Sequence, residues 1–257
     1  MLFTLMTLLA ALGTFLGMLA MLVLGRRLGA RHLQQDPGGA KPSLGAVEGA
    51  VFGLLGLLMA FTFSGAASRF DGRRQLIVQE ANAIGTAYLR LDLLPPPVRD
   101  GLREDFRHYL DARLGVFQSA PDSAPSRAAQ NHAVQLQNTI WAKAVTACKA
   151  EVQAPPAMLL LPALNEMIDI TATRAMAAHT HPPVVIYLML GALTLVGALF
   201  AGYSMTEGRV SRTHLLGFAA LFALTIFVIL DLEYPRLGLI RVEAADQVMV
   251  ELRASMN

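Results

Sequence analysis

A proline-free segment over residues 44–94 is the feature that most limits how this chain can fold. Residues 44–67 are apolar, and residues 68–94 repeat apolar side chains at helical spacing between charged ones. An α-helix rises about 1.5 Å per residue, and a bilayer core requires about 20 apolar residues. The segment therefore predicts one helix that crosses a membrane and continues into water.

Three further apolar runs indicate a membrane protein. They cover residues 2–25, 184–205 and 215–230, and the whole chain is 54% hydrophobic with a mean hydropathy of +0.47. A wholly water-soluble fold rarely has this composition. The N-terminal run begins without the basic leader of a cleaved signal peptide, so we expect it to remain as a membrane span. The sequence thus predicts four spans in two hairpins, within residues 1–67 and 182–232.

The part of the chain between the hairpins, residues 68–181, has the composition of a water-soluble helical domain. Proline-rich breaks divide it into segments with helical apolar periodicity, and no segment alternates apolar and polar residues as a strand would. In the first segment Ile77 and Ile84 belong to the apolar stripe, and we place Glu80 on another face. The predicted fold class is an all-α membrane protein with a helical domain inserted between its second and third spans, followed by a C-terminal tail at residues 233–257.

Composition and motifs argue against several functional classes. A net charge of +2 without a recognition motif does not predict nucleic-acid binding. Cys148 is the only cysteine, so no intrachain disulfide or cysteine-based metal site can form. The six histidines lack metal-binding helical spacing, and no nucleophile has a partner base at catalytic spacing. We therefore expect neither a metal, a cofactor nor an enzymatic activity.

One face of the second span, continued into the next segment, combines aromatic and small side chains. Its members are Phe52, Gly56, Met59, Phe63, Ala67 and Phe70. This pattern fits either ordinary bundle packing or the lining of a pore. A ring of apolar side chains can close a pore because an ion that loses its hydration there incurs a large desolvation cost. Small residues beside this face, and the Gly13 and Gly17 pair in the first span, predict close helix contacts.

Four polar residues are candidates for specific contacts. Glu48 is the acidic residue of the second span, where it either extends toward the lipid headgroups or marks a pore mouth. Asn165 and Asp169 are spaced to share one helix face. They either contact an ion or a neighbouring subunit, or belong to a buried hydrogen-bond network with Arg174.

Three blocks of sequence resemble the bestrophin-like domain family of bacterial integral membrane proteins. They are LLMAFTFSGAASRFDGRRQLIVQEANAIGTAYLRLDLLP, the later LNEMID followed by Arg174, and DLEYPRLGLI at residues 231–240. The resemblance covers nearly the whole chain. It implies an architecture related to bestrophins, which are pentameric anion channels with four membrane helices per subunit and a pore lined by the second helix.

By this resemblance, the face from Phe52 to Phe70 becomes a candidate pore lining, with an inorganic anion, membrane lipid and further copies of the chain as partners. Two features depart from bestrophins. Neck phenylalanines of bestrophins recur every four residues, whereas Phe61 and Phe63 lie two apart. The acidic calcium clasp of animal bestrophins is also missing, because Asp231 and Glu233 stand almost alone, so calcium gating is not implied.

Loop charges predict the orientation of the chain in a bacterial inner membrane. The two short loops between paired spans carry more basic than acidic residues: Arg26, Arg27, Arg31, Lys41, Arg209 and Arg212 against Asp36 and Glu207. By the positive-inside rule both loops are cytoplasmic, which puts the helical domain and both termini in the periplasm. Bestrophins have the opposite arrangement.

Two functional hypotheses follow from the sequence. The first is an oligomeric, anion-permeable channel whose second spans surround the pore. The second is a membrane-anchored scaffold or sensor whose helical domain binds a protein partner without passing ions. A hydrated axis with ion flux would distinguish the first from the second.

Overall fold

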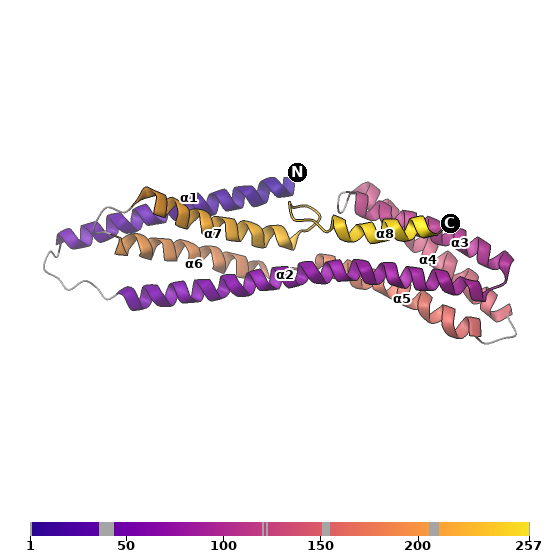
Figure 1. The fold of residues 1–257 in the computed structure, drawn as a ribbon. Coiled ribbons are helices and arrows are strands. Elements are labelled where there is room, and N and C mark those ends of the chain that lie inside the picture. Colours follow the sequence, from indigo (N-terminus) through magenta and orange to yellow (C-terminus); the bar gives the residue numbers. More distant parts are fainter. Residues whose placement is uncertain are drawn as a thin grey trace. The chain divides into compact units, whose positions relative to one another are not determined.

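The computed structural model describes residues 2–35, 44–119, 121, 123–150, 155–205 and 211–256. Within these ranges the regular structure is helical, which confirms the all-α class (Figure 1). The helices are α1 (Leu2–Gln35), α2 (Leu44–Arg90), η1 (Leu91–Leu93), α3 (Pro96–Gln118), α4 (Ala124–Ala150), α5 (Pro155–His179), α6 (Val184–Ser204), α7 (Arg212–Glu233) and α8 (Glu243–Ser255).

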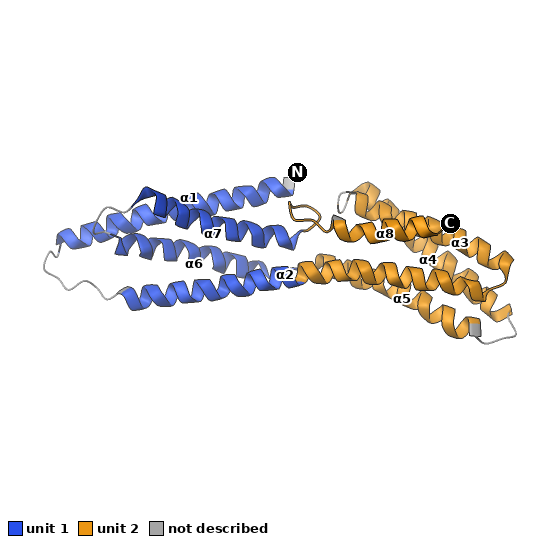
Figure 2. Ribbon diagram, in the orientation of Figure 1, with its two compact units in different colours: residues 1–68, 181–234 blue, residues 69–180, 235–257 orange. Residues whose placement is uncertain are grey.

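The chain divides into two compact units, coloured separately in Figure 2. Unit 1 comprises residues 1–68 and 181–234, and unit 2 comprises residues 69–180 and 235–257. The first part of α2 belongs to unit 1 and its remainder to unit 2, as one unbroken helix. This continuity agrees with the helix predicted over residues 44–94, which changes to the 3-10 turn η1 just before its end.

Four helical segments are long and apolar enough to cross a membrane, as the sequence predicted. They include α1, α2, α6 and α7. In α2 the charged side chains at Glu48 and Arg69 bracket a charge-free stretch, residues 49–68. This stretch matches the roughly 20 residues that a bilayer core requires. The protein is an integral membrane protein.

Unit 1 is held together by close packing of α1 against α6 and α7. Met18 and Leu22 of α1 are buried with small residues of the other two helices, namely Ala198, Ala201 and Ala219. The tightest contact is between backbones: a Cβ atom added at Gly25 would lie 2.1 Å from the carbonyl oxygen of Leu199. One added at Gly202 would lie 2.2 Å from the carbonyl oxygen of Leu22.

This contact lies further along α1 than the predicted glycine pair. A Cβ atom at Gly17 would lie 3.0 Å from Leu195 Cδ2, whereas one at Gly13 would meet no atom of the described chain within 4 Å. Only the second glycine of the predicted seam therefore faces another helix of the described chain.

Unit 2 is a helical bundle with a large apolar core. Buried residues come from α2, η1, α3, α4, α5 and α8, among them Ile77, Ile84, Leu91, Phe106, Ile140, Leu164 and Met249. Helix α8 was not predicted within the C-terminal tail; it packs Met249 into the core, and its Arg253 pairs with Asp111 of α3 at 2.7 Å. Prolines begin α3 and α5 rather than only separating helices, because a first-turn residue needs no intrahelical N–H partner.

Candidate functional site

The candidate face of α2 has residues in several environments. Phe52 is half-buried and packs within unit 1, its ring centroid 6.1 Å from that of Phe218. Met59 and Ala67 are also half-buried, whereas Phe63 is 44% exposed. Phe70 belongs to unit 2 and packs against that unit's core. On this face, the residues open to the surroundings of unit 1 are therefore Phe63 and, two helical turns before it, Gly56.

The small-residue side of α2 is not covered by the described part of unit 1. Cβ atoms added at Gly49, Gly53 or Gly56 would meet no atom within 4 Å. Ala60 and Ser64, further along the helix, are exposed as well, while Leu55 and Ala66 on the other side are buried. The face predicted to make close helix contacts is thus available to another molecule.

Glu48 begins the membrane part of α2 with a defined partner. It accepts a hydrogen bond of 2.6 Å from Ser204 Oγ, at the end of α6. Its side chain is half-buried. This contact joins two spans at one end of unit 1, and it leaves both roles proposed for Glu48 open.

A buried ion network occupies the interior of unit 2. Glu80 of α2 is fully buried, and it accepts hydrogen bonds from Arg113 Nε of α3 at 2.6 Å and from Arg174 Nη1 of α5 at 2.5 Å. Both arginines are almost completely buried. One carboxylate therefore bridges three helices through charged hydrogen bonds, which are the strong class of such bonds.

The charges of this network modify each other's ionisation. Burial by itself raises the pKa of Glu80, but attraction by Arg113 and Arg174 and their hydrogen bonds outweigh it, so the pKa lies below its ordinary value. Burial lowers the pKa of Arg113, and the attraction of Glu80 more than compensates and raises it. Burial also raises the pKa of the neighbouring Tyr109. Glu80 is thus held as a carboxylate.

The network continues to α8 and to the segment before it. Asp246 of α8 accepts hydrogen bonds from both terminal nitrogens of Arg236, each at 2.9 Å, and one of 3.3 Å from Arg174. The guanidinium carbons of Arg174, Arg236 and Arg113 lie 3.7, 4.7 and 5.0 Å from the ring centroid of Phe117. Cation–π contacts of this kind stabilise charges that water reaches poorly. The network fastens α8 to the bundle.

The candidate polar pair on α5 lies apart from this network. Asn165 and Asp169 are exposed, and the side chain of Arg174 pairs with Glu80 and Asp246. Their alternative role, contact with an ion or another subunit, stays a prediction. Arg174 lies in a buried network, but one made with Glu80 and Asp246 and without Asn165 or Asp169.

Glu80, Arg113 and Asp246 were not among the predicted site residues. A signal was present for Glu80, which lies three residues after Ile77 and four before Ile84, within the spacing of the apolar stripe. Its placement on another face was wrong, since the side chain is buried. Asp246 gave no comparable signal, because Arg236 lies ten residues before it, outside helical spacing, and Arg174 lies in a distant helix.

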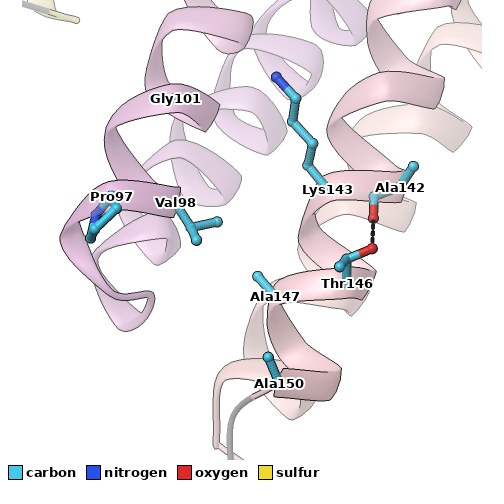
Figure 3. Close-up of a pocket in the computed structure, with 8 residues that line it drawn as sticks. All are labelled: Pro97, Val98, Gly101, Ala142, Lys143, Thr146, Ala147 and Ala150. Atoms are coloured by element: carbon cyan, nitrogen blue, oxygen red, sulfur yellow. Dashed lines mark hydrogen bonds between the residues drawn. The ribbon is translucent and has the colours of Figure 1, made fainter.

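A groove of about 580 Å³ lies on unit 2 between the start of α3 and the end of α4 (Figure 3). It is lined by Pro97, Val98, Gly101, Ala142, Lys143, Thr146, Ala147 and Ala150. Lys143 pairs with Asp105 at 2.6 Å, and Thr146 donates a hydrogen bond to the carbonyl oxygen of Ala142. Its small, largely apolar lining offers a surface for packing rather than a set of reactive groups. Among the described residues, no cluster of three metal-ligating side chains occurs.

The fold is that of a helical membrane protein with four helices able to cross a membrane and a second compact helical unit. The chain belongs to the bestrophin-like domain family, which it matches over residues 11–246. A mutant of a bacterial bestrophin homologue from Klebsiella pneumoniae shares the fold, with a TM-score of 0.66 and 15% identity, over 93% of this chain and 97% of that one.

A second solved structure, a mutant of a membrane protein, is similar with a TM-score of 0.68 and 14% identity over 97% of this chain and 98% of that chain. No curated protein sequence matches the chain. Family and fold together describe a membrane protein of the bestrophin-like type.

Proposed function

We propose that this protein is an oligomeric, anion-permeable channel in which the α2 helices of several subunits surround the pore. The supporting observation is the open face of α2 at residues 49–68. Phe63 is 44% exposed there, and Gly53 and Gly56 have no neighbour within 4 Å of an added Cβ. Small residues let helices approach closely in lipid, where packing drives association. Copies of α2 could therefore assemble around an axis.

The chemistry of Phe63 suits a constriction for anions. A ring of phenylalanines narrows a pore without providing hydrogen bonds, so permeation depends on wetting and on the hydration of the ion. The ring edge of phenylalanine carries positive partial charge, which favours an anion over a cation at the same distance. Five copies would correspond to the bestrophin assembly.

Phenylalanine substitutions on α2 test this proposal. Phe61 and Phe63 are both exposed, at 68% and 44%, but are separated by about 200° around the helix. We expect Phe63→Ala to raise chloride flux through liposomes several-fold, because the constriction widens, and Phe61→Ala to leave it unchanged. Equal effects of the two variants, with both chains folded, would contradict a pore lined by the Phe63 face.

One observation, the groove on unit 2, supports the second hypothesis, a scaffold that passes no ions. Its volume of about 580 Å³ and its apolar lining suit an apolar helix of a protein partner. This hypothesis requires a filled central axis, and the same liposomes would then pass no chloride.

We propose further that the chain lies in a bacterial inner membrane with its loops after α1 and α6 in the cytoplasm. The excess of basic residues at these two loops supports this orientation. Unit 2 and both termini would then be periplasmic. A reporter that works only in the periplasm should be active when it is fused after Asn257. Activity of a cytoplasm-only reporter at the same position would reverse the assignment.

A further inference from the structure

The end of α1 carries four residues that alternate between apolar and basic along one exposed face. Leu24, Arg27, Leu28 and Arg31 follow the i, i+3, i+4, i+7 spacing of a single helix face. Leu24 and Leu28 are 45% and 41% exposed, and both arginines are exposed. We propose that this face, here named the α1 stripe, binds the phosphate of an anionic phospholipid headgroup.

The stripe begins where the apolar part of α1 ends. Residues 2–25 carry no charge, and Arg26 is the first charged side chain. Side chains on a helix lean toward its N-terminus, so Arg27 and Arg31 reach back toward the lipid that α1 has just left. The leucines then contact acyl chains, and the guanidinium groups lie at the level of the headgroups.

The arginines of the stripe have the right chemistry for phosphate. They lie one helical turn apart, about 6 Å along the axis, which is close enough for both to contact one headgroup. A guanidinium group can donate two parallel hydrogen bonds to phosphate oxygens. In the described part of the chain, neither Arg27 nor Arg31 is paired with a carboxylate. Their charges are therefore available to a ligand.

The surroundings of the stripe within unit 1 are also basic. Arg212 and His214 are exposed at the start of α7, one of the helices that packs on α1. Glu48, the acidic residue described at this end of unit 1, already accepts a hydrogen bond from Ser204. In the two loop sequences the acidic Asp36 and Glu207 are balanced by Lys41 and Arg209. The remaining arginines give an excess of positive charge.

A tyrosine side chain lies near the end of the α1 stripe. His32, next to Arg31, has its ring centroid 6.3 Å from that of Tyr203 at the end of α6. Tyrosine is enriched where a span meets the headgroups, because its ring is apolar and its hydroxyl is polar. Apolar, basic and aromatic groups thus gather at this end of unit 1. The proposal does not depend on ion conduction.

Lipid binding to the full-length protein tests the proposal. The wild type is placed in a neutral detergent, and phosphatidylglycerol or phosphatidylcholine is titrated, with bound lipid counted by native mass spectrometry. Each arginine near an anionic surface contributes about a factor of five in affinity. We therefore expect Arg27→Gln combined with Arg31→Gln to weaken phosphatidylglycerol binding about 25-fold, while phosphatidylcholine binding stays the same.

A matched variant and a free anion complete the test. Arg74→Gln removes an exposed arginine of unit 2 that is 3.4 Å from Asp71, and it should not change binding. Inorganic phosphate, added alone at millimolar concentration, should not displace the lipid. The proposal is overturned if the two lipids bind equally, if Arg74→Gln has as large an effect as the double variant, or if inorganic phosphate competes with equal affinity. All altered side chains are exposed, so each variant should elute as the wild type does.

Discussion

Replacing Glu80 with glutamine is expected to unfold unit 2 under conditions in which the wild-type chain is folded. The substitution keeps the shape but removes the charge that balances Arg113 and Arg174, both almost completely buried. Breaking a buried ion pair by removing one partner costs about 3–5 kcal/mol. A typical domain is stable by only about 5–15 kcal/mol, so this loss is a large share of the stability of unit 2.

The fluorescence of Trp141 measures this effect directly. Trp141 is the only tryptophan of the chain and packs against the core of unit 2, so its emission reports the unfolding of that unit. Glu104→Gln is the control, because Glu104 is exposed on α3 and surface substitutions change stability by about 0.5 kcal/mol or less. A thermal midpoint for Glu80→Gln equal to that of the control would refute the network's role.

Acid should weaken unit 2 through the same residue. Because the pKa of Glu80 is lowered from its ordinary value of 4.5, the stability it contributes is fully present above that value. It is lost as the pH falls through the lower pKa of the folded state. The thermal midpoint of the wild type, followed by Trp141 fluorescence, should therefore decrease once the pH falls below about 4.5. Between about pH 6 and 8, Glu80 should cause no change in this midpoint.

Replacing Gly25 with alanine is expected to disrupt unit 1. The new methyl group would lie 2.1 Å from the carbonyl oxygen of Leu199, a backbone atom that cannot rotate away. Helices α1 and α6 would have to separate, and they would lose the contacts of Met18 and Leu22 with Ala198 and Ala201. Overpacking of this kind costs about 1–3 kcal/mol, and we expect the upper end because backbone atoms must move.

Gly13→Ala provides the matched control on the same helix. Its methyl group has open space around it, and alanine is favoured over glycine in a helix by about 1 kcal/mol. On size-exclusion chromatography, Gly13→Ala should give as much protein in the monodisperse peak as the wild type does. Gly25→Ala should give much less. If both variants behaved as the wild type, the close approach of α1 and α6 would be wrong.

The helices were predictable from sequence wherever local pattern determines them. Long apolar runs predicted the four spans, and the absence of proline predicted that α2 continues beyond the membrane. Helix α8 was missed because it is only 13 residues long and its stability comes from contacts such as Asp246 with Arg236, which join residues of separate segments. Helix formation of this kind depends on tertiary packing rather than on local pattern.

The candidate site was predictable only in part for a related reason. Periodicity identifies the face of α2 that contains Phe63, but it cannot tell which residues on that face pack inside the subunit. Phe52 belongs to the face and nevertheless packs near Phe218. Likewise, the polarity of Glu80 suggested an exposed position, whereas two arginines from other helices allow its burial.

Chloride efflux from liposomes that contain the purified wild-type protein, with the number of subunits determined on the same sample, tests the central claim most directly. The channel account predicts a ring-shaped oligomer and efflux above that of protein-free liposomes, increased by Phe63→Ala. A monomer that passes no chloride, in liposomes where the chain is folded and inserted, would contradict it.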